Sequence, residues 1–386
     1  MMKKMKSIML AALALAAVSC VYPFSAETED GSGALVIEGD IYVGELTTVT
    51  LGYTSPINGV PHDPPFGEVW VEDDAGTMYH GVFRVVSSDS SKSHYDIDTR
   101  HADPGREYRL HVRINGRSYE SEWAPVCPPP EIDSLSYLKV PEKETLNITL
   151  SMHSHKGSFF KWSYVEDWEY HSDYFANLKL ENSIGKGMVI VPMVYPENTY
   201  YCFKHAVSTE ILTFSTEKQT DDRFVDLEFH KIPRTDDRLS YLYRIRVALE
   251  PLSKDAYTYW ENIKANSDYS GSLFAPTPSE MVGNIRCVED PGEFVFGFIN
   301  VAQRAVKTLY LDALDVRYYK RSEPYVEGDE VASNQWRQYI MMEYLPYSSL
   351  IPGDYSTTYW APARCVDCRK RGGTKDRPED WPLIHW

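Results

Sequence analysis

Near the C-terminus, Cys365 and Cys368 form a Cys-x-x-Cys motif, a spacing that can serve three kinds of chemistry. A structural zinc site would need two further ligands, but the sequence has no second such motif and only His385 nearby. A thioredoxin-like redox pair would need a βαβ context, which the surrounding residues do not show. We therefore favour a structural disulfide between Cys365 and Cys368 that closes the C-terminal tail, with metal binding and redox chemistry as open alternatives.

The sequence contains six cysteines, and one of them, Cys20, stands where a lipid would be attached. Of the remainder, Cys202 and Cys287 are the next candidate disulfide pair. Cys127 would then be left unpaired. The spacing of cysteines does not determine their connectivity, so this pairing is a hypothesis.

Two other groups of side chains have metal-ligand character. His153 and His155 alternate along one strand and could hold a metal together with Glu166 or Asp167. A single His-x-His at a strand end is more often a polar edge, so we predict no metal site. Three acidic clusters lack the spacing of an EF-hand loop and are interpreted as solvated turns: Glu72 to Asp74, Asp221 to Asp222 and Asp236 to Asp237.

No sequence motif of a known catalytic or nucleotide-binding site is present. There is no Gly-x-Ser-x-Gly nucleophile elbow, no P-loop and no Rossmann glycine fingerprint. The run Gly372 to Lys375 lacks the strand and helix that a phosphate loop requires. The aromatic stretch 162–170 (WSYVEDWEY) could stack on sugars or peptides, although strand and core packing is the favoured interpretation. We predict no catalytic residues, no cofactor and no metal.

The N-terminus has the pattern of an export signal. Lys3, Lys4 and Lys6 precede an apolar run too short to span a bilayer, and the residues A-V-S-C end at Cys20. This pattern is similar to a bacterial lipobox and predicts a lipoprotein signal peptide over 1–19 with lipid attached to Cys20, an ordinary secretory signal being the alternative. Residues 20–33 form a polar tether. Its acidic run, Glu27 to Asp30, is either a surface-export signal or a solvated linker.

Composition points to a globular protein of about two domains. The 386 residues are 43% hydrophobic and include 28 Tyr, a residue that suits half-buried strands. The formal net charge of −17 argues against nucleic acid as a partner.

Alternating apolar residues predict a mostly β fold with two β-sandwich-type domains. Short strands over 34–127 predict an immunoglobulin-like sandwich, and its clearest hairpin, 106–123, turns at Asn115-Gly116. The prolines that follow Cys127 mark a boundary, because consecutive prolines cannot enter a central strand. A larger β-rich domain over 131–386 then follows and ends in the Cys-x-x-Cys tail. The segment 336–345 is compatible with strand or helix.

One substantial helix is predicted within the second domain, over 254–266. Ser253 is positioned to cap it, and Ala256, Tyr257, Trp260 and Ile263 recur at helical spacing. The apolar face that these residues form must pack on the surrounding sheet.

With these segments in view, the chain resembles an uncharacterised family of Bacteroidota outer-membrane lipoproteins, domain of unknown function 4249. The resemblance rests on LVIEGDI, on YRIRVALEPLSKDAYTYWENIK, on SLFAPTPSEMVGNIRCVEDPGEFVFGFINVA and on the tail CVDCRKRGGTKDRPEDWP. It implies a lipid-anchored protein of the outer membrane that faces the cell surface and assists a TonB-dependent receptor. No enzymatic activity is attached to the family.

These observations lead to three functional hypotheses. The first is a non-catalytic accessory or binding component that acts with a TonB-dependent receptor in nutrient uptake. The second is a surface enzyme that hydrolyses glycans or peptides, which would require a carboxylate pair or a metal in a cleft. The third is an adhesin or scaffold. We favour the first and expect no enzyme activity.

Overall fold

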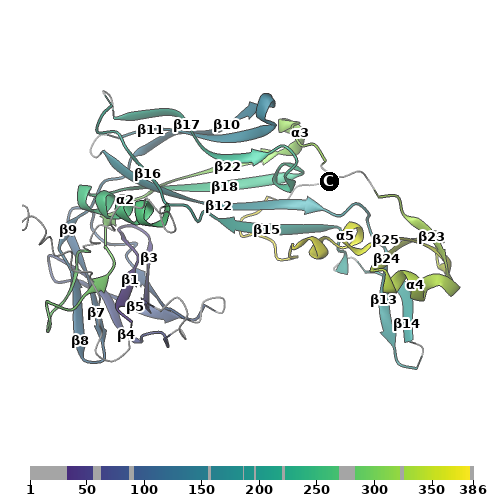
Figure 1. Cartoon of the computed structure of the whole chain (residues 1–386), viewed down its shortest axis with the longest axis horizontal. Helices are drawn as coiled ribbons and strands as arrows, with labels where there is room; N and C mark the ends of the chain where they lie inside the picture. Colours follow the sequence, from purple (N-terminus) through teal and green to yellow (C-terminus); the bar gives the residue numbers. More distant parts are fainter. Residues whose placement is uncertain are drawn as a thin grey trace, which may run out of the picture.

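The computed structural model describes residues 33–54, 62–86, 91–154, 158–185, 187–194, 197–219, 222–268, 283–321 and 326–382. These residues are mostly β-strands arranged in several sheets, which confirms the predicted fold class. Figure 1 shows an N-terminal domain at one end of the long axis, a central domain, and a smaller distal module at the other end. Within the described ranges, no helix has the length and apolar character needed to cross a membrane.

The N-terminal domain is a β-sandwich whose strands follow one path, β19-β8-β7-β4-β5-β6-β3-β1-β20. Strand β5 joins the two halves, because it pairs first with β4 and then, from Gly81, with β6. The Tyr108 hydroxyl donates to the Asp103 carbonyl over 2.7 Å, the tyrosine-corner contact of immunoglobulin-like sandwiches. Its first strands are β1 Leu35–Glu38, β2 Ile41–Tyr42, β3 Leu46–Tyr53, β4 Gly67–Asp73, β5 Met78–Arg84, β6 Ser93–Asp98, β7 Glu107–Ile114, β8 Arg117–Ser121 and β9 Ala124–Pro125.

The predicted hairpin is formed by β7 and β8. Asn115 and Gly116 have φ values of 51° and 81°, as a two-residue turn with positive φ at both central positions requires. Leu110 and Val112 of β7 are buried in the core of the sandwich, so the predicted alternation is confirmed.

A segment that we placed in the second domain completes this sandwich. Strand β19 (Ile285–Cys287) pairs with β8, and β20 (Val295–Phe296) runs parallel to β1. A third short strand, β21 (Val301–Ala302), pairs with β2. Their apolar side chains belong to the same core as β1 to β8. Residues 34–127 are therefore not the whole domain, because its core closes only when the chain returns after the long helix.

The central domain is a second sandwich. A sheet in the order β15-β12-β18-β22, with β16 also pairing with β12, packs on a sheet in the order β10-β11-β17. Between them lie Ile148 and Leu150 of β11 and Ile245 and Val247 of β18. The elements are β10 Glu131–Val140, η1 Pro141–Lys143, β11 Thr145–His153, β12 Phe159–His171, β15 Tyr201–Val207, β16 Leu212–Ser215, β17 Arg223–Pro233, η3 Asp237–Leu239, β18 Leu242–Pro251, β22 Ala305–Asp312 and α3 Ala313–Val316.

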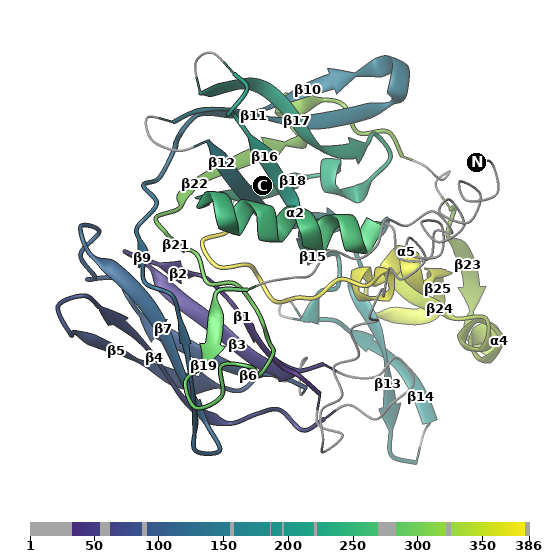
Figure 2. The ribbon, with the colours of Figure 1, turned by 60° about the vertical axis from the view of Figure 1, so that its left-hand side comes forward.

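The predicted helix is α2 (Lys254–Asp268), which lies across the central sheet in Figure 2. The Ala256 N–H donates to Ser253 Oγ over 3.1 Å, so the predicted cap is confirmed. Ala256 is fully buried, and the Tyr257 ring packs on the Phe159 ring with centroids 4.8 Å apart. The predicted apolar face therefore packs on the first residue of β12.

The distal module has small cores of its own. Trp360 is fully buried among Leu178, Ile190 and Val331. The segment left open between strand and helix begins as a helix, α4, and ends as a strand, β24. The elements are β13 Leu178–Ser183, β14 Gly187–Pro192, β23 Asp329–Ala332, η4 Ser333–Gln335, α4 Trp336–Met341, β24 Tyr344–Ile351, β25 Asp354–Pro362, α5 Ala363–Val366 and η5 Cys368–Arg371.

The N-terminal and central domains meet at a buried polar group that we call the junction cluster: Asp40, Tyr42, Lys161, Glu250 and Asn300. Lys161 Nζ lies 2.9 Å from Asp40 Oδ2 and 3.2 Å from Glu250 Oε2. Tyr42 and Asn300 donate to the two oxygens of Glu250 over 2.9 Å and 3.0 Å. The two domains are thus joined by buried ion pairs and hydrogen bonds.

Candidate functional site

A polar cleft of about 700 Å³ opens between the central domain and the distal module. This volume is in the range of pockets that hold small molecules. Its walls come from β12, β15, η3, α5 and η5 and from the segments around Tyr200 and Tyr319. The lining residues are Trp168, Tyr170, His171, Ser172, Asp173, Tyr200, Lys204, Thr235, Asp236, Asp237, Arg238, Ser240, Tyr241, Tyr319, Arg321, Val326, Arg364, Cys365 and Arg371.

Strand β12 supplies the floor of the cleft. Because side chains alternate along a strand, Glu166, Trp168 and Tyr170 share the face that buries Phe160 and Trp162 farther back. Trp168 and Tyr170 are themselves buried and present part of their surface to the cleft. The aromatic stretch 162–170 is therefore core packing along most of its length and cleft floor at its end.

Beneath the floor, Glu166 is held by three donors. His230 Nε2 lies 2.8 Å from its carboxylate, Arg238 Nε donates over 2.9 Å, and the Tyr243 hydroxyl donates over 2.7 Å. Burial opposes ionisation of Glu166, but these hydrogen bonds and the nearby positive charges outweigh it and lower its pKa to about 2. The same Arg238 guanidinium stacks 4.2 Å above the Trp168 ring and so forms part of the cleft wall.

The remaining carboxylates of the cleft pair with arginines on its walls. Arg238 Nη1 lies 3.1 Å from Asp236, and Arg371 Nη2 lies 2.8 Å from Asp237. Arg321 Nη2 lies 2.7 Å from Asp173. These pairs join η3 to η5 and β12 to the segment after α3, so the ionic contacts also fix the shape of the cleft.

Aromatic hydroxyls and an imidazole complete the lining. The Tyr241 ring stacks on His171 with centroids 3.4 Å apart, and Tyr200 lies 4.8 Å from the same imidazole. Burial raises the pKa of Tyr170 to about 12 and also raises the pKa of Tyr241 and Tyr319. These phenols are therefore neutral at physiological pH, and each keeps a hydroxyl that can donate a hydrogen bond.

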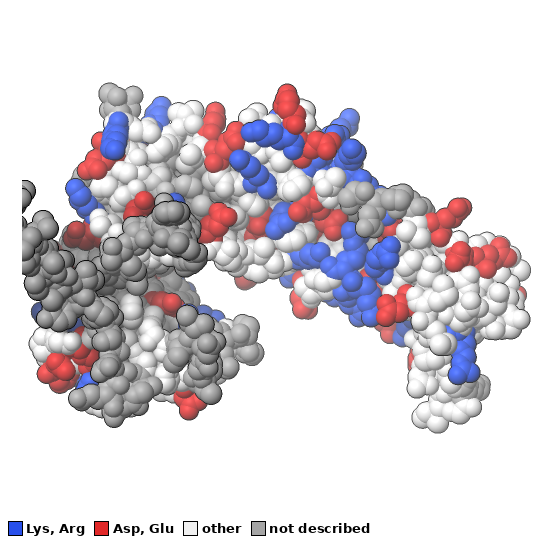
Figure 3. Space-filling view, viewed as in Figure 1, with Lys and Arg blue, Asp and Glu red and all other residues white. Residues whose placement is uncertain are grey.

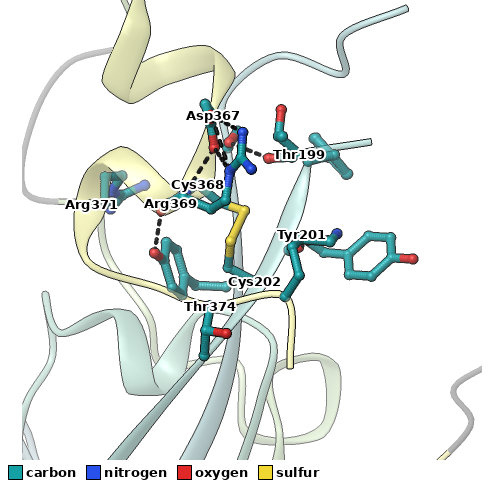
Figure 4. Close-up of a disulfide and its surroundings, with 12 residues drawn as sticks. Thr199, Tyr201, Cys202, Asp367, Cys368, Arg369, Arg371 and Thr374 are labelled. Atoms are coloured by element: carbon teal, nitrogen blue, oxygen red, sulfur yellow. Dashed lines mark hydrogen bonds and ion pairs between the residues drawn. A yellow bond between two sulfur atoms is a disulfide. The ribbon is translucent and has the colours of Figure 1, made fainter. Parts of the chain in front are cut away.

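A disulfide between Cys202 and Cys368 fastens the C-terminal wall of the cleft to β15. Figure 4 shows η5 drawn against the strand at this bond, with the Arg369 guanidinium turned back to Asp367. Tyr170, from the floor, donates its hydroxyl to the Cys368 carbonyl. Beyond η5, Thr374 exchanges backbone hydrogen bonds with Phe203. The C-terminal segment is thus attached to β15 at both Cys368 and Thr374.

Both predicted disulfide pairings are wrong. Cys368 pairs with Cys202, while Cys365 and Cys287 are buried free thiols and Cys127 is a partly buried one. Cys365 lies in α5 and lines the cleft, whereas Cys368 follows the end of this helix and lies against β15. Cys287 lies in β19, in the core of the N-terminal domain, far from the strand that carries Cys202.

The sequence profile of a family described as Domain of unknown function (DUF4249) matches residues 21–308. The match covers well over half of the chain. The chain belongs to the DUF4249 family. The matched range includes the cleft residues of β12, β15 and η3, while Arg321, Arg364 and Arg371 of this DUF4249 protein lie beyond its end.

No curated protein matches this DUF4249 chain. Among solved structures, the crystal structure of a DUF4785 family protein from Legionella pneumophila is 10% identical, with a TM-score of 0.18. That comparison covers 57% of this chain and 51% of the other, so the chain spans about half the length of that protein. A similarity at this level carries no argument about the fold or the site.

The other predicted site residues lie outside the cleft or outside the described residues. His153 Nδ1 lies 2.8 Å from Asp133 at the edge of β11, and His155 and Asp221 fall outside the described ranges, as does Cys20. Asp73 accepts hydrogen bonds from the N–H groups of Ala75 and Thr77, so this acidic cluster forms the predicted turn, but Asp73 itself is buried and not solvated. In the described part of the chain, no three His, Cys, Asp or Glu side chains gather in a way that would hold a metal ion.

The sequence points to the aromatic stretch 162–170 as a possible binding surface, although core packing is the favoured interpretation, and it does not identify the cationic side chains of the cleft. Lys204, Arg238 and Arg321 lie singly in three separate segments, so no local pattern marks them. The run Arg369 to Arg371 that follows the Cys-x-x-Cys motif was the one visible signal, and only Arg371 of that run lines the cleft.

Proposed function

We propose that this DUF4249 protein is a surface-exposed outer-membrane lipoprotein that binds a small ligand without transforming it and acts with a TonB-dependent receptor in nutrient uptake. The observation that carries the proposal is the cleft, because its walls come from five elements and are held by three ion pairs and a disulfide. A preorganised polar cavity of this kind is typical of a binding site.

A binding role is favoured over catalysis by the state of the reactive groups. The three carboxylates that line the cleft each pair with an arginine. Burial and the neighbouring Asp173 raise the pKa of the Cys365 thiol to about 11, so the thiol is protonated at neutral pH. Nucleophilic cysteines instead have a lowered pKa and an adjacent base.

The membrane anchor rests on the sequence. The pattern that ends at Cys20 supports lipid attachment, and the polar tether would leave the two domains free above the membrane. Cys20→Ala should shift the protein from the membrane fraction to the soluble fraction of lysed cells. Retention in the membrane fraction would contradict a lipid anchor at this cysteine.

The partnership with a receptor is tested by purification. The intact lipoprotein, isolated with an affinity tag from detergent-solubilised outer membrane, should bring with it a barrel protein in stoichiometric amount. Isolation of the lipoprotein alone under mild detergent would contradict the accessory role and favour the adhesin or scaffold hypothesis. Turnover of a peptide or glycan by the purified protein would contradict the non-catalytic role.

A further inference from the structure

We propose that the ligand of the cleft is a small anion, a molecule that carries phosphate or carboxylate groups and neutralises Lys204 and Arg364. This inference rests on the proposed binding function and adds the chemical class of the ligand. Phosphate and carboxylate present the same chemistry to the site, namely oxyanions that accept several charge-assisted hydrogen bonds.

The first support is the balance of charge in the cleft. Its lining holds five cationic side chains, Lys204, Arg238, Arg321, Arg364 and Arg371, and three carboxylates, Asp173, Asp236 and Asp237. The whole chain has the opposite balance, with 39 Lys and Arg against 56 Asp and Glu. Figure 3 shows Lys and Arg side chains gathered on the face near α5. The cleft is thus a local positive region in an acidic protein.

The second support is that internal pairing leaves two cations over. Arg238, Arg321 and Arg371 are paired with the three carboxylates of the lining. Among the residues that the structure describes, neither Lys204 nor Arg364 forms an ion pair with a carboxylate. The surplus therefore consists of one ammonium group from β15 and one guanidinium group from α5, on different walls of the same cleft.

Lys204 is the stronger indicator of the two because it is half-buried. Its Nζ lies 4.7 Å from the centroid of the Tyr170 ring, a cation–π contact on the floor of the cleft. Burial is the largest cause of the lowered pKa of Lys204; the carboxylates of Asp237 and Asp236 oppose this shift, and the positive charges of Arg371 and Arg238 add to it. A partly desolvated cation that has no ion-pair partner is stabilised when an anion binds beside it.

The other groups of the lining suit the same ligand class. Guanidinium groups bind phosphate and carboxylate through paired N–H donors, and the neutral phenol of Tyr319 can donate a further hydrogen bond. The volume of about 700 Å³ accommodates a molecule with more than one anionic group.

Isothermal titration of the mature, full-length protein at constant ionic strength tests the proposal. The ligands are pyrophosphate, citrate, glucose as a neutral control and spermidine as a cationic control. We expect pyrophosphate or citrate to bind, and glucose and spermidine not to bind. The stronger of the two anions identifies which oxyanion the site prefers.

Lys204→Gln should weaken anion binding by at least about tenfold, the scale of one charge-assisted contact. Arg364→Gln should weaken it less, because Arg364 is exposed. Lys254→Gln is the matched control. Lys254 is exposed on α2, so this substitution removes the same charge at a position away from the cleft. Thermal melts of all three variants show whether each is folded.

Two results would overturn the proposal: neither anion binds better than glucose, or Lys254→Gln weakens binding as much as Lys204→Gln does. Binding of glucose or spermidine that is lost on mutation of the cleft would overturn the anion assignment and leave the binding function standing. If the protein binds an anion in the cleft but captures no receptor, the anion assignment is supported and the partnership with a receptor is contradicted.

Discussion

Two buried glutamates of the central domain have opposite electrostatic surroundings. Glu250 in the junction cluster and Glu166 beneath the cleft each have a side chain only 4% exposed. Burial together with the neighbouring Asp40 raises the pKa of Glu250 to about 7, whereas the pKa of Glu166 is lowered to about 2. The pKa values of these two buried carboxyl groups are therefore shifted in opposite directions.

Part of the difference lies in the partners of each carboxylate. In the junction cluster, Glu250 and Asp40 share a single ammonium group, that of Lys161. Beneath the cleft, Glu166 alone receives Arg238 and His230 together with the Tyr243 hydroxyl. The hydrogen-bond donors and cations beside each carboxylate thus contribute to the direction of its pKa shift. In the junction cluster two carboxylates share one ammonium group, whereas five cationic side chains and three carboxylates line the cleft.

The largest expected effect is at the junction. Lys161→Met would leave two buried carboxylates without a cation and should lower the free energy of unfolding by about 3–5 kcal/mol. Chemical denaturation of the wild type and the variant measures this change. Lys254→Met, at an exposed position, should change the stability by less than about 0.5 kcal/mol. Similar effects for both variants would mean that the junction cluster does not hold the domains together.

The corresponding change beneath the cleft should have a smaller effect. Glu166→Gln removes the negative charge that pairs with Arg238 and accepts a hydrogen bond from His230, but Arg238 keeps Asp236 as a partner. We expect a loss of about 2–3 kcal/mol, the scale of hydrogen bonds to a charged group. Denaturation at pH 7 measures it. A loss of stability as large as that of Lys161→Met would mean that the remaining pair of Arg238 with Asp236 does not compensate for the lost charge.

The two glutamates also predict opposite responses to pH. The pKa of Glu250 is higher in the folded protein than its ordinary value of 4.5, so its contribution to stability is fully present below about pH 4.5 and is lost as the pH rises to about 7. The slope approaches about 1 kcal/mol per pH unit, near the limit for one proton. Glu166, with a lowered pKa, instead contributes stability above about pH 4.5 that is lost as the pH falls toward 2.

Denaturation midpoints between pH 4.5 and 7 test this contrast. Glu250→Gln, which keeps a side chain able to contact Tyr42 and Asn300, should flatten the pH dependence over that range. An unchanged slope in this variant would assign the pH dependence to another group.

The smallest expected effect is that of removing the hydrogen bond that caps α2, an uncharged contact next to the junction cluster. Ser253 follows strand β18 directly and caps α2 through the Ala256 N–H. Ser253→Ala should cost about 1 kcal/mol, and Ser253→Asp should restore most of it, because both Ser and Asp accept the capping hydrogen bond. Thermal denaturation compares the three proteins. If Ser253→Asp is no more stable than Ser253→Ala, the cap does not contribute through this hydrogen bond.

The sequence alone determined the local elements of the fold. The alternation of apolar residues over 106–123 marked a hairpin, the Asn115-Gly116 pair marked its turn, and Ser253 marked the start of α2. These features depend on residues within a few positions of one another, and their preferences act before any tertiary contact is made.

Tertiary structure alone decided which distant segments meet. Cys368 lies three residues from Cys365, yet it is bonded to Cys202 across a separation of 166 residues, because η5 crosses β15 there. A separate return of the chain, after α2, brings Ile285 and Val295 to the N-terminal core. The cleft is likewise assembled from residues far apart in the sequence, between Trp168 and Arg371. Local propensity contains no information on such contacts, since they form only when apolar faces far apart in the sequence find a common core.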